Sequence, residues 1–205
     1  MSNKKTSSLK ARVVVISGPS GCGKTTLHKA LLASPLLKGK LVKSLSATTR
    51  VKRPGERSGR DYLFLSPQIF KDRIKKGYFL EWEKVFDQYY GTPKRQVLKL
   101  LKKGIHVLLC IDVKGARNVV RAFPKALKIF IKAPSLKILE ARLKARGSES
   151  RETLALRLKV ARSELKEAKY YDYIVINANL KKALEKLQQI VDNELLCGCS
   201  ARGIH

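Results

Sequence analysis

Acidic residues are scarce in this chain, which carries 16 Asp and Glu against 44 Lys and Arg over 205 residues, for a formal net charge of +28. The first acidic residue along the chain is Glu56. An excess of this size predicts an anionic partner without specifying which one. No nucleic-acid recognition motif accompanies the charge, so we expect no specific nucleic-acid partner, only weak and salt-sensitive binding. With 44% hydrophobic residues, the chain is also too apolar to be a disordered polycation.

Long hydrophobic runs are missing as well. The longest, residues 107–111, has the length of a strand and is far short of the roughly 18 residues that cross a membrane, so we expect no membrane partner. The basic N-terminal residues precede no apolar segment with a cleavage site, so we expect no export. Four cysteines, Cys22, Cys110, Cys197 and Cys199, form neither a metal pattern nor a disulfide framework. We therefore expect a reducing, cytoplasmic location.

Strand-like and helix-like segments alternate along the chain. Strands are predicted at 12–17, 41–47, 61–65, 79–86, 105–111, 127–132 and 173–177. Helices are predicted at 25–33, from a Ser66 cap to Gly77, from a Thr92 cap to Gly104, from a Ser135 cap to 146, then to 169, and from Asn179 to 196. This alternation predicts one α/β domain over 12–196, a parallel-sheet core with helices on both faces. Residues 45–95 break the rhythm and read as an inserted mixed-β lobe, and 1–11 and 197–205 as loose termini.

A glycine-rich segment between the first strand and the first helix matches the phosphate-binding pattern G-x-x-x-x-G-K-[ST]. Its glycines let backbone N–H groups approach phosphate oxygens, Lys24 reaches the β- and γ-phosphates, and the Thr25 hydroxyl is placed to bind Mg²⁺. Asp112, at the end of an apolar strand, is a second candidate near Mg²⁺, through water. The predicted ATP-binding residues are Gly18, Pro19, Ser20, Gly21, Cys22, Gly23, Lys24, Thr25 and Thr26.

A second group of residues suits a phosphorylated acceptor. Arg50 and Arg53 can fork around a phosphate, to which the hydroxyls of Tyr62 and Tyr90 can donate. Glu81 lies among apolar residues and needs a partner, and one carboxylate can accept both N1–H and N2–H of a guanine. Taken singly, each has an ordinary alternative: solvated loop arginines, aromatics that pack in a core, and a surface acid.

These residues together resemble the nucleoside-monophosphate lobe of guanylate kinases. The resemblance rests on S-A-T-T-R at 46–50, R-P-G-E at 53–56, R-D-Y at 60–62, F-L-E-W at 79–82 and Y-Y-G-T at 89–92, and it extends over about 12–195. It implies core segments 12–44, 96–134 and 170–196, a GMP-binding lobe at 45–95 and a helical lid at 135–169. It assigns Ser46, Glu81 and Thr92 to the base, Arg50, Arg53, Tyr62 and Tyr90 to the phosphate, Glu56 to the orientation of the arginines, Arg142, Arg146 and Arg157 to the lid, and Asn177 to the adenine of ATP.

The resemblance implies an enzyme that uses ATP and Mg²⁺ to phosphorylate GMP and dGMP, with Lys24, Arg50 and the lid arginines Arg142, Arg146 and Arg157 as its catalytic residues. Two positions depart from the family: Cys110 stands where an acid is usual, and Lys114 where glutamine is usual. Three alternatives remain open at this point. They are an inactive interaction module of the same fold, a nucleic-acid-binding protein with the same phosphate loop, and a kinase for another phosphorylated small molecule.

Overall fold

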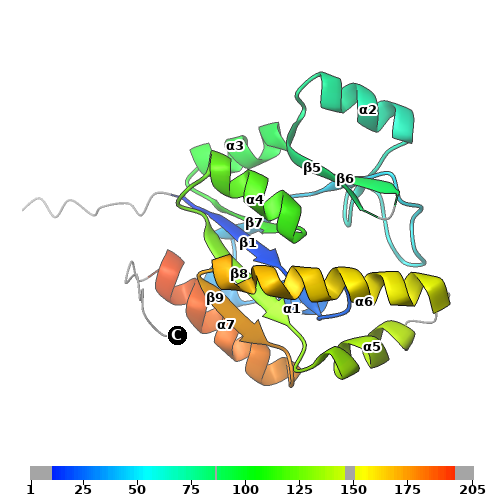
Figure 1. The fold of residues 1–205 in the computed structure, drawn as a ribbon. Helices are drawn as coiled ribbons and strands as arrows, with labels where there is room; N and C mark the ends of the chain where they lie inside the picture. The colour runs from blue at the N-terminus through cyan, green and yellow to red at the C-terminus, as the bar shows by residue number, and fades with distance from the viewer. Residues whose placement is uncertain (1–10, 86, 146–150, 197–205) are drawn as a thin grey trace, which may run out of the picture.

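The structure, a computed structural model, describes residues 11–85, 87–145 and 151–196, and its core is a five-stranded sheet (Figure 1). In order across the sheet the strands are β2 (Leu41–Lys43), β7 (His106–Cys110), β1 (Val13–Ser17), β8 (Leu127–Lys132) and β9 (Tyr173–Ile176). Every neighbouring pair is parallel, so helices must carry the chain back between strands. The predicted α/β class with a parallel-sheet core is confirmed.

Helices cover both faces of this sheet (Figure 1). The α-helices are α1 (Lys24–Leu32), α2 (Pro67–Lys75), α3 (Lys94–Lys102), α4 (Val113–Ala122), α5 (Leu136–Lys144), α6 (Arg151–Lys166) and α7 (Leu180–Leu195), and short 3₁₀ helices are η1 (Pro35–Leu37) and η2 (Glu167–Tyr170). Val14 and Ile16 of β1 pack on the side of α1 and α7, whereas Val13 and Val15 pack on the side of α3 and α4. This strand is apolar throughout because both of its faces are buried.

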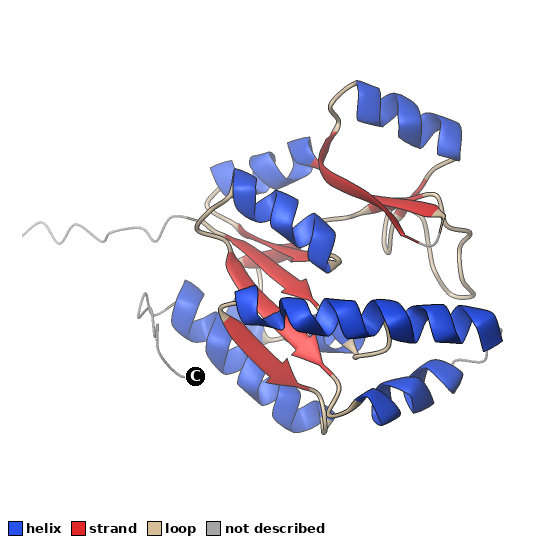
Figure 2. Ribbon diagram, viewed as in Figure 1, coloured by secondary structure: helices blue, strands red, loops and turns tan. Residues whose placement is uncertain are grey.

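A second, mixed sheet lies beside the core (Figure 2). Its order is β4 (Leu63–Phe64), β3 (Ala47–Thr48), β6 (Gln88–Pro93) and β5 (Phe79–Val85), with only β3 and β4 parallel. Helix α2 covers it through Phe70, whose ring stacks on Phe79 at 4.4 Å and on Tyr89 at 5.3 Å between centroids. This sheet therefore has a small aromatic core of its own.

Two predictions about this region are wrong. The expected strand over 41–47 is divided between the two sheets, because the chain crosses over at Ser44 and Leu45, where Gln96 Oε1 accepts from the Ser44 hydroxyl at 3.3 Å and from the Leu45 N–H at 3.1 Å. Thr92 does not cap α3. It lies in β6, which the sequence did not predict, and its hydroxyl donates to Glu81 instead.

The predicted caps at Ser66 and Ser135 are confirmed, since each side chain accepts from a backbone N–H of its helix, and Asn179, predicted only as the start of the last helix, caps α7 in the same way. Helix α4 was not predicted, and Asp112, expected as the last residue of a strand, is its N-cap. The expected helix to 169 ends in η2, a 3₁₀ turn. Residues 1–10, 146–150 and 197–205, with Arg146 and most of both expected loose termini, lie outside the described residues. No described helix is long and apolar enough to cross a membrane.

Candidate nucleotide-binding site

The phosphate-binding loop connects β1 to α1, as the sequence pattern requires. Gly23 has φ +94°, and a Cβ there would lie 2.2 Å from Asn177 Nδ2, so neither the backbone conformation nor the space admits a side chain. Asn177 is buried, and its amide donates to Cys22 O at 2.9 Å. The residue that follows β9 thus holds the loop through its side chain.

Two cations, Lys24 and Arg142, lie at or beside the phosphate loop. Lys24 Nζ donates to Gly18 O at 2.5 Å and to Pro19 O at 2.9 Å, which keeps the ammonium at the loop. Arg142 Nη2 donates to Asn177 O at 2.9 Å, beside the loop. The side-chain amide of Asn177 donates to the loop backbone. Its expected contact with the adenine of ATP stays a prediction.

A cleft of about 310 Å³ has walls from both sheets and from α6. The sequence-predicted residues that line it are Gly18, Ser20, Lys24, Ser46, Arg50, Arg53, Tyr62, Glu81, Tyr90, Asp112 and Arg157. Residues 20 and 157 meet directly, because Arg157 Nη1 donates to Ser20 Oγ at 3.0 Å. The predicted residues that do not line the cleft, among those described, are Pro19, Gly21, Cys22, Gly23, Thr25, Thr26, Glu56, Thr92, Arg142 and Asn177.

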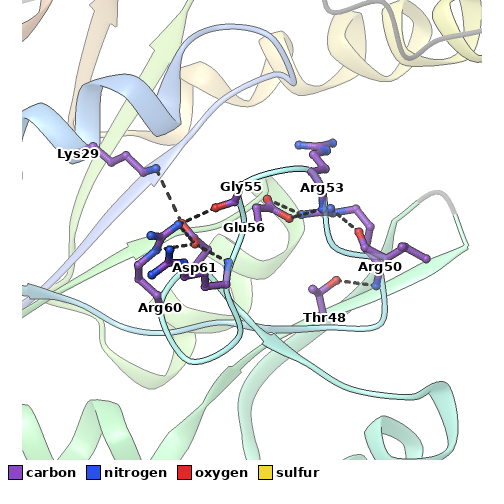
Figure 3. A network of polar contacts seen from close by, with 10 residues as sticks. Lys29, Thr48, Arg50, Arg53, Gly55, Glu56, Arg60 and Asp61 are labelled. Carbon is purple, nitrogen blue, oxygen red and sulfur yellow. Dashed lines mark hydrogen bonds and ion pairs between the residues drawn. The ribbon is translucent and has the colours of Figure 1, made fainter.

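Arg50 is held in a network on the loop that follows β3 (Figure 3). Both oxygens of Glu56 accept from Arg50 Nη2 at 2.9 Å, and Glu56 Oε2 also accepts from the Arg53 N–H at 2.9 Å. Partial burial opposes ionisation of Glu56, but the bonds from Arg53 and Arg50 prevail and lower its pKa. Arg50 also lies over the Tyr62 ring, 5.6 Å from the centroid. The guanidinium is therefore positioned before any anion binds.

Asp61 anchors the far end of the same loop (Figure 3). It accepts from Arg60 Nε and from the Arg57 N–H, each at 2.9 Å, and it lies 3.8 Å from Lys29 Nζ on α1. Next to it, burial raises the pKa of Tyr62 to about 12, so its hydroxyl stays protonated at neutral pH and can donate to an anion. The Tyr62 and Tyr90 rings meet edge to face at 6.4 Å.

Glu81 is the buried acid of the cleft, 6% exposed. Burial raises its pKa to about 7, and the charge of Asp112 adds to the rise, whereas the Thr92 hydroxyl, which donates to Oε1 at 2.5 Å, opposes it. Its other oxygen lies against α4, where a Cβ on Gly115 would come within 2.6 Å of Oε2. The sequence analysis did not predict Gly115 as a site residue, because it did not predict α4. A glycine inside a predicted helix would have been the signal, since glycine is unfavourable there.

The sequence also missed Glu164, which lines the cleft from α6. It lies seven residues after Arg157 and therefore on the same face of the helix. This spacing could have identified Glu164 from the sequence. Burial raises the pKa of Glu164 to about 7, with Lys24 opposing and Asp112 adding to the rise. Other unpredicted lining residues are Val85, Gln88, Gly91, Ile111 and Val160, and Cys110, singled out only as a departure from the family, lines it too.

The residues present suit a metal ion held mainly by nucleotide phosphates. In the described ranges, no group of three His, Cys, Asp or Glu side chains could enclose a metal. Mg²⁺ commonly keeps several waters and takes only one or two protein oxygens beside phosphates. Thr25, exposed in the first turn of α1, offers a hydroxyl, and Asp112, at the cleft, offers a carboxylate. The site therefore fits Mg²⁺ bound together with a nucleotide.

A parallel sheet whose first strand leads through a glycine-rich phosphate loop into a helix, beside a cleft with charged side chains in its lining, defines a P-loop nucleotide-binding protein. Comparisons with known proteins narrow this class. A family model described as guanylate kinase matches residues 10–194. A guanylate kinase from Caldanaerobacter subterraneus subsp. tengcongensis is 47% identical over 179 residues, 87% of this chain and 85% of that protein. The chain therefore belongs to the guanylate kinase family.

Further relatives agree with this assignment. A guanylate kinase from Rickettsia prowazekii is 41% identical over 182 residues, which cover 89% of this chain and 91% of that protein. The crystal structure of guanylate kinase from Anaplasma phagocytophilum aligns with a TM-score of 0.73 at 28% identity, covering 93% of this chain and 89% of that one. The resemblance inferred from the sequence is confirmed.

Proposed function

We propose that this protein transfers the γ-phosphoryl group of ATP to GMP or dGMP, giving ADP and GDP or dGDP. The observation that carries the proposal is the buried Glu81–Thr92 pair, which shares one cleft with Arg50 and with the phosphate loop. An intact phosphate loop argues against the inactive interaction module of the same fold. The cytoplasmic location inferred from the cysteines stays a prediction.

Glu81 recognises the guanine. Its ionised carboxylate accepts N1–H and N2–H together, and adenine offers no such pair of donors. The Ser46 hydroxyl, which lines the cleft, addresses the remaining base edge, whereas the buried Thr92 acts on the base through Glu81. Because Thr92 donates to Oε1 of Glu81, it also fixes the plane of the carboxylate. A buried group of this kind discriminates strongly, since the wrong base would leave it unpaired.

Arg50, Arg53, Tyr62 and Tyr90 bind the GMP phosphate. The bonds from Arg50 to Glu56 hold the guanidinium in place, so little side-chain entropy is lost on binding. A GMP phosphate oxygen is the nucleophile and is ionised at neutral pH, so no general base is required. It attacks the γ-phosphorus in line, the bond to the β,γ-bridging oxygen breaks, and ADP leaves with that electron pair.

The phosphate loop and the lid act on ATP. Loop N–H groups, Lys24 and Arg157 bind the β- and γ-phosphates, with Arg142 and Arg146 as further lid cations. Thr25 and, by way of water, Asp112 would hold Mg²⁺, which would neutralise charge on these phosphates. The protein thus supplies positioning, charge stabilisation and exclusion of water.

Turnover of a substrate panel tests the proposal. In a coupled ADP-release assay with ATP, we expect GMP and dGMP to be the best acceptors and AMP, UMP and sugar phosphates to be poor ones. ADP release that does not depend on any monophosphate, or faster turnover of AMP or UMP than of GMP, would overturn it. The panel also separates this activity from that of a kinase for another phosphorylated molecule.

Gly115→Ala should raise KM for GMP about tenfold or more and leave KM for ATP unchanged. The added methyl group would lie 2.6 Å from Glu81 Oε2 and must displace the carboxylate that reads the base. Alanine is the better helix former, so loss of the fold is not the expected cause. Arg121→Ala, an exposed change on the same helix, is the matched control. An unchanged KM for GMP would show that Glu81 does not need this space.

A further inference from the structure

A predominantly basic surface runs along α2 and α3, outside the cleft, and the one acid within these two helices is the partly buried Asp72. Its exposed residues, which we call the α2–α3 ridge, are Lys71, Lys75, Lys76, Lys94, Arg95, Lys99, Lys102 and Lys103. Residues 88–111 contain no Asp or Glu. None of the ridge residues lines the nucleotide cleft. Direct contact with ATP and GMP therefore does not explain this concentration of charge.

The end of α2 lies close to the start of α3. The Lys94 N–H, at the start of α3, donates to Tyr78 O at 3.0 Å, just beyond the end of α2. Arg73 of α2 lies over the Tyr78 ring, 4.7 Å from its centroid, and fills the junction. Figure 1 shows α2 and α3 on the same side of the molecule, connected through β5 and β6. Cations from both helices can therefore face one extended anion.

The ridge is not neutralised from within the protein. Among the described residues, no ridge cation forms an ion pair, whereas on α5 Lys144 pairs with Glu140 at 2.7 Å. Arg95, Lys99 and Lys103 follow at i, i+4 spacing, where like charges repel and destabilise a helix. The last-turn residues Lys99 and Lys102 gain from the helix dipole, but the repulsion among the three cations remains, and a polyanion would relieve it.

We propose that the α2–α3 ridge binds the phosphate backbone of nucleic acid without reading its sequence. An extended row of unpaired cations fits regularly spaced phosphates, and release of their counterions provides the affinity. A membrane surface fits less well, because helices that lie on membranes bury an apolar face in the lipid. In α3, Val97 is fully buried and Leu100 and Leu101 pack against the core, which leaves Leu98, 37% exposed.

A matched pair of triple variants tests the proposal. Lys99→Gln/Lys102→Gln/Lys103→Gln removes three ridge charges, and Lys181→Gln/Lys182→Gln/Lys186→Gln removes three exposed charges from α7. Binding of a labelled oligouridylate is followed by fluorescence anisotropy between about 50 and 200 mM salt. At about 100 mM, we expect the ridge variant to bind roughly tenfold more weakly and the α7 variant nearly as tightly as wild type. The slope of log K against log salt should become shallower by about 2 in the ridge variant.

Three results would overturn the proposal. Equal losses in both variants would show that net charge alone matters, and no binding by wild type at low salt would exclude the surface. Retained oligouridylate binding with lost binding to phosphatidylglycerol vesicles would assign the ridge to membranes. Unchanged GMP phosphorylation in both variants is expected, because none of the substituted residues lines the cleft, and it verifies that the fold is intact.

Discussion

Lys24→Ala is expected to lower kcat for GMP phosphorylation by about 10²- to 10³-fold, the loss typical when one preorganised donor to a developing charge is removed. Its Nζ already lies at the phosphate loop, where it donates to the carbonyls of Gly18 and Pro19. No other lysine lines the cleft among the described residues, so none can replace its charge. The coupled ADP-release assay, run at saturating ATP and GMP, measures the effect.

Lys29→Ala is the matched control, because Lys29 lies on the same helix and its side chain is 65% exposed. Its ion pair with Asp61, at 3.8 Å, is too exposed to contribute much, so activity should change less than about twofold. Thermal unfolding should be similar in both variants. A Lys24→Ala protein with a rate within tenfold of wild type would refute the role of Lys24 in catalysis.

Glu81→Gln should reduce kcat/KM for GMP by about 100-fold or more, because the new amide presents donors to the donors of guanine. The ratio of activity on inosine monophosphate to activity on GMP should rise, since inosine lacks the N2 amino group. Glu83→Gln is the control, two residues along β5 and absent from the lining of the cleft. A parallel loss on both substrates would indicate a general disturbance of the cleft and not a lost guanine contact.

Stability gives a second and independent reading of Glu81. Burial raises its pKa to about 7 from an ordinary 4.5, so between these values the folded protein binds more protons than the unfolded chain. Glu81 therefore makes the protein less stable as the pH rises through this window. At pH 8, which lies above it, Glu81→Gln should unfold at the same or a higher temperature than wild type, and the gain should vanish near the lower end of the window. A clear loss of stability at pH 8 would contradict the destabilising effect of burial on the ionised carboxylate.

Local sequence signals predicted the parts of the fold that depend on neighbours along the chain. The β-branched residues Val13, Val14 and Val15 indicated a buried strand, and the caps at Ser66 and Ser135 marked helix starts, because a cap bonds only within its own first turn. The signals failed where distant residues decide. The strand expected over 41–47 is interrupted where Ser44 bonds to Gln96. Thr92, expected to cap a helix, bonds to Glu81 instead.

The sequence by itself determined the class of this protein, because the backbone of consecutive residues forms a phosphate-binding loop. The spacing of those residues along the chain is therefore enough to recognise it. It also determined the membership in the guanylate kinase family that the comparisons confirmed. Only the tertiary structure decided that Glu81 is buried against Gly115, that Arg157 meets Ser20, and that Asn177 supports the loop. The scarcity of acids divides in the same way: composition indicated an anionic partner, whereas the fold brought the end of α2 close to the start of α3, where the Lys94 N–H donates to Tyr78 O. Such contacts join residues far apart in the chain, and no local pattern specifies which side chains will meet.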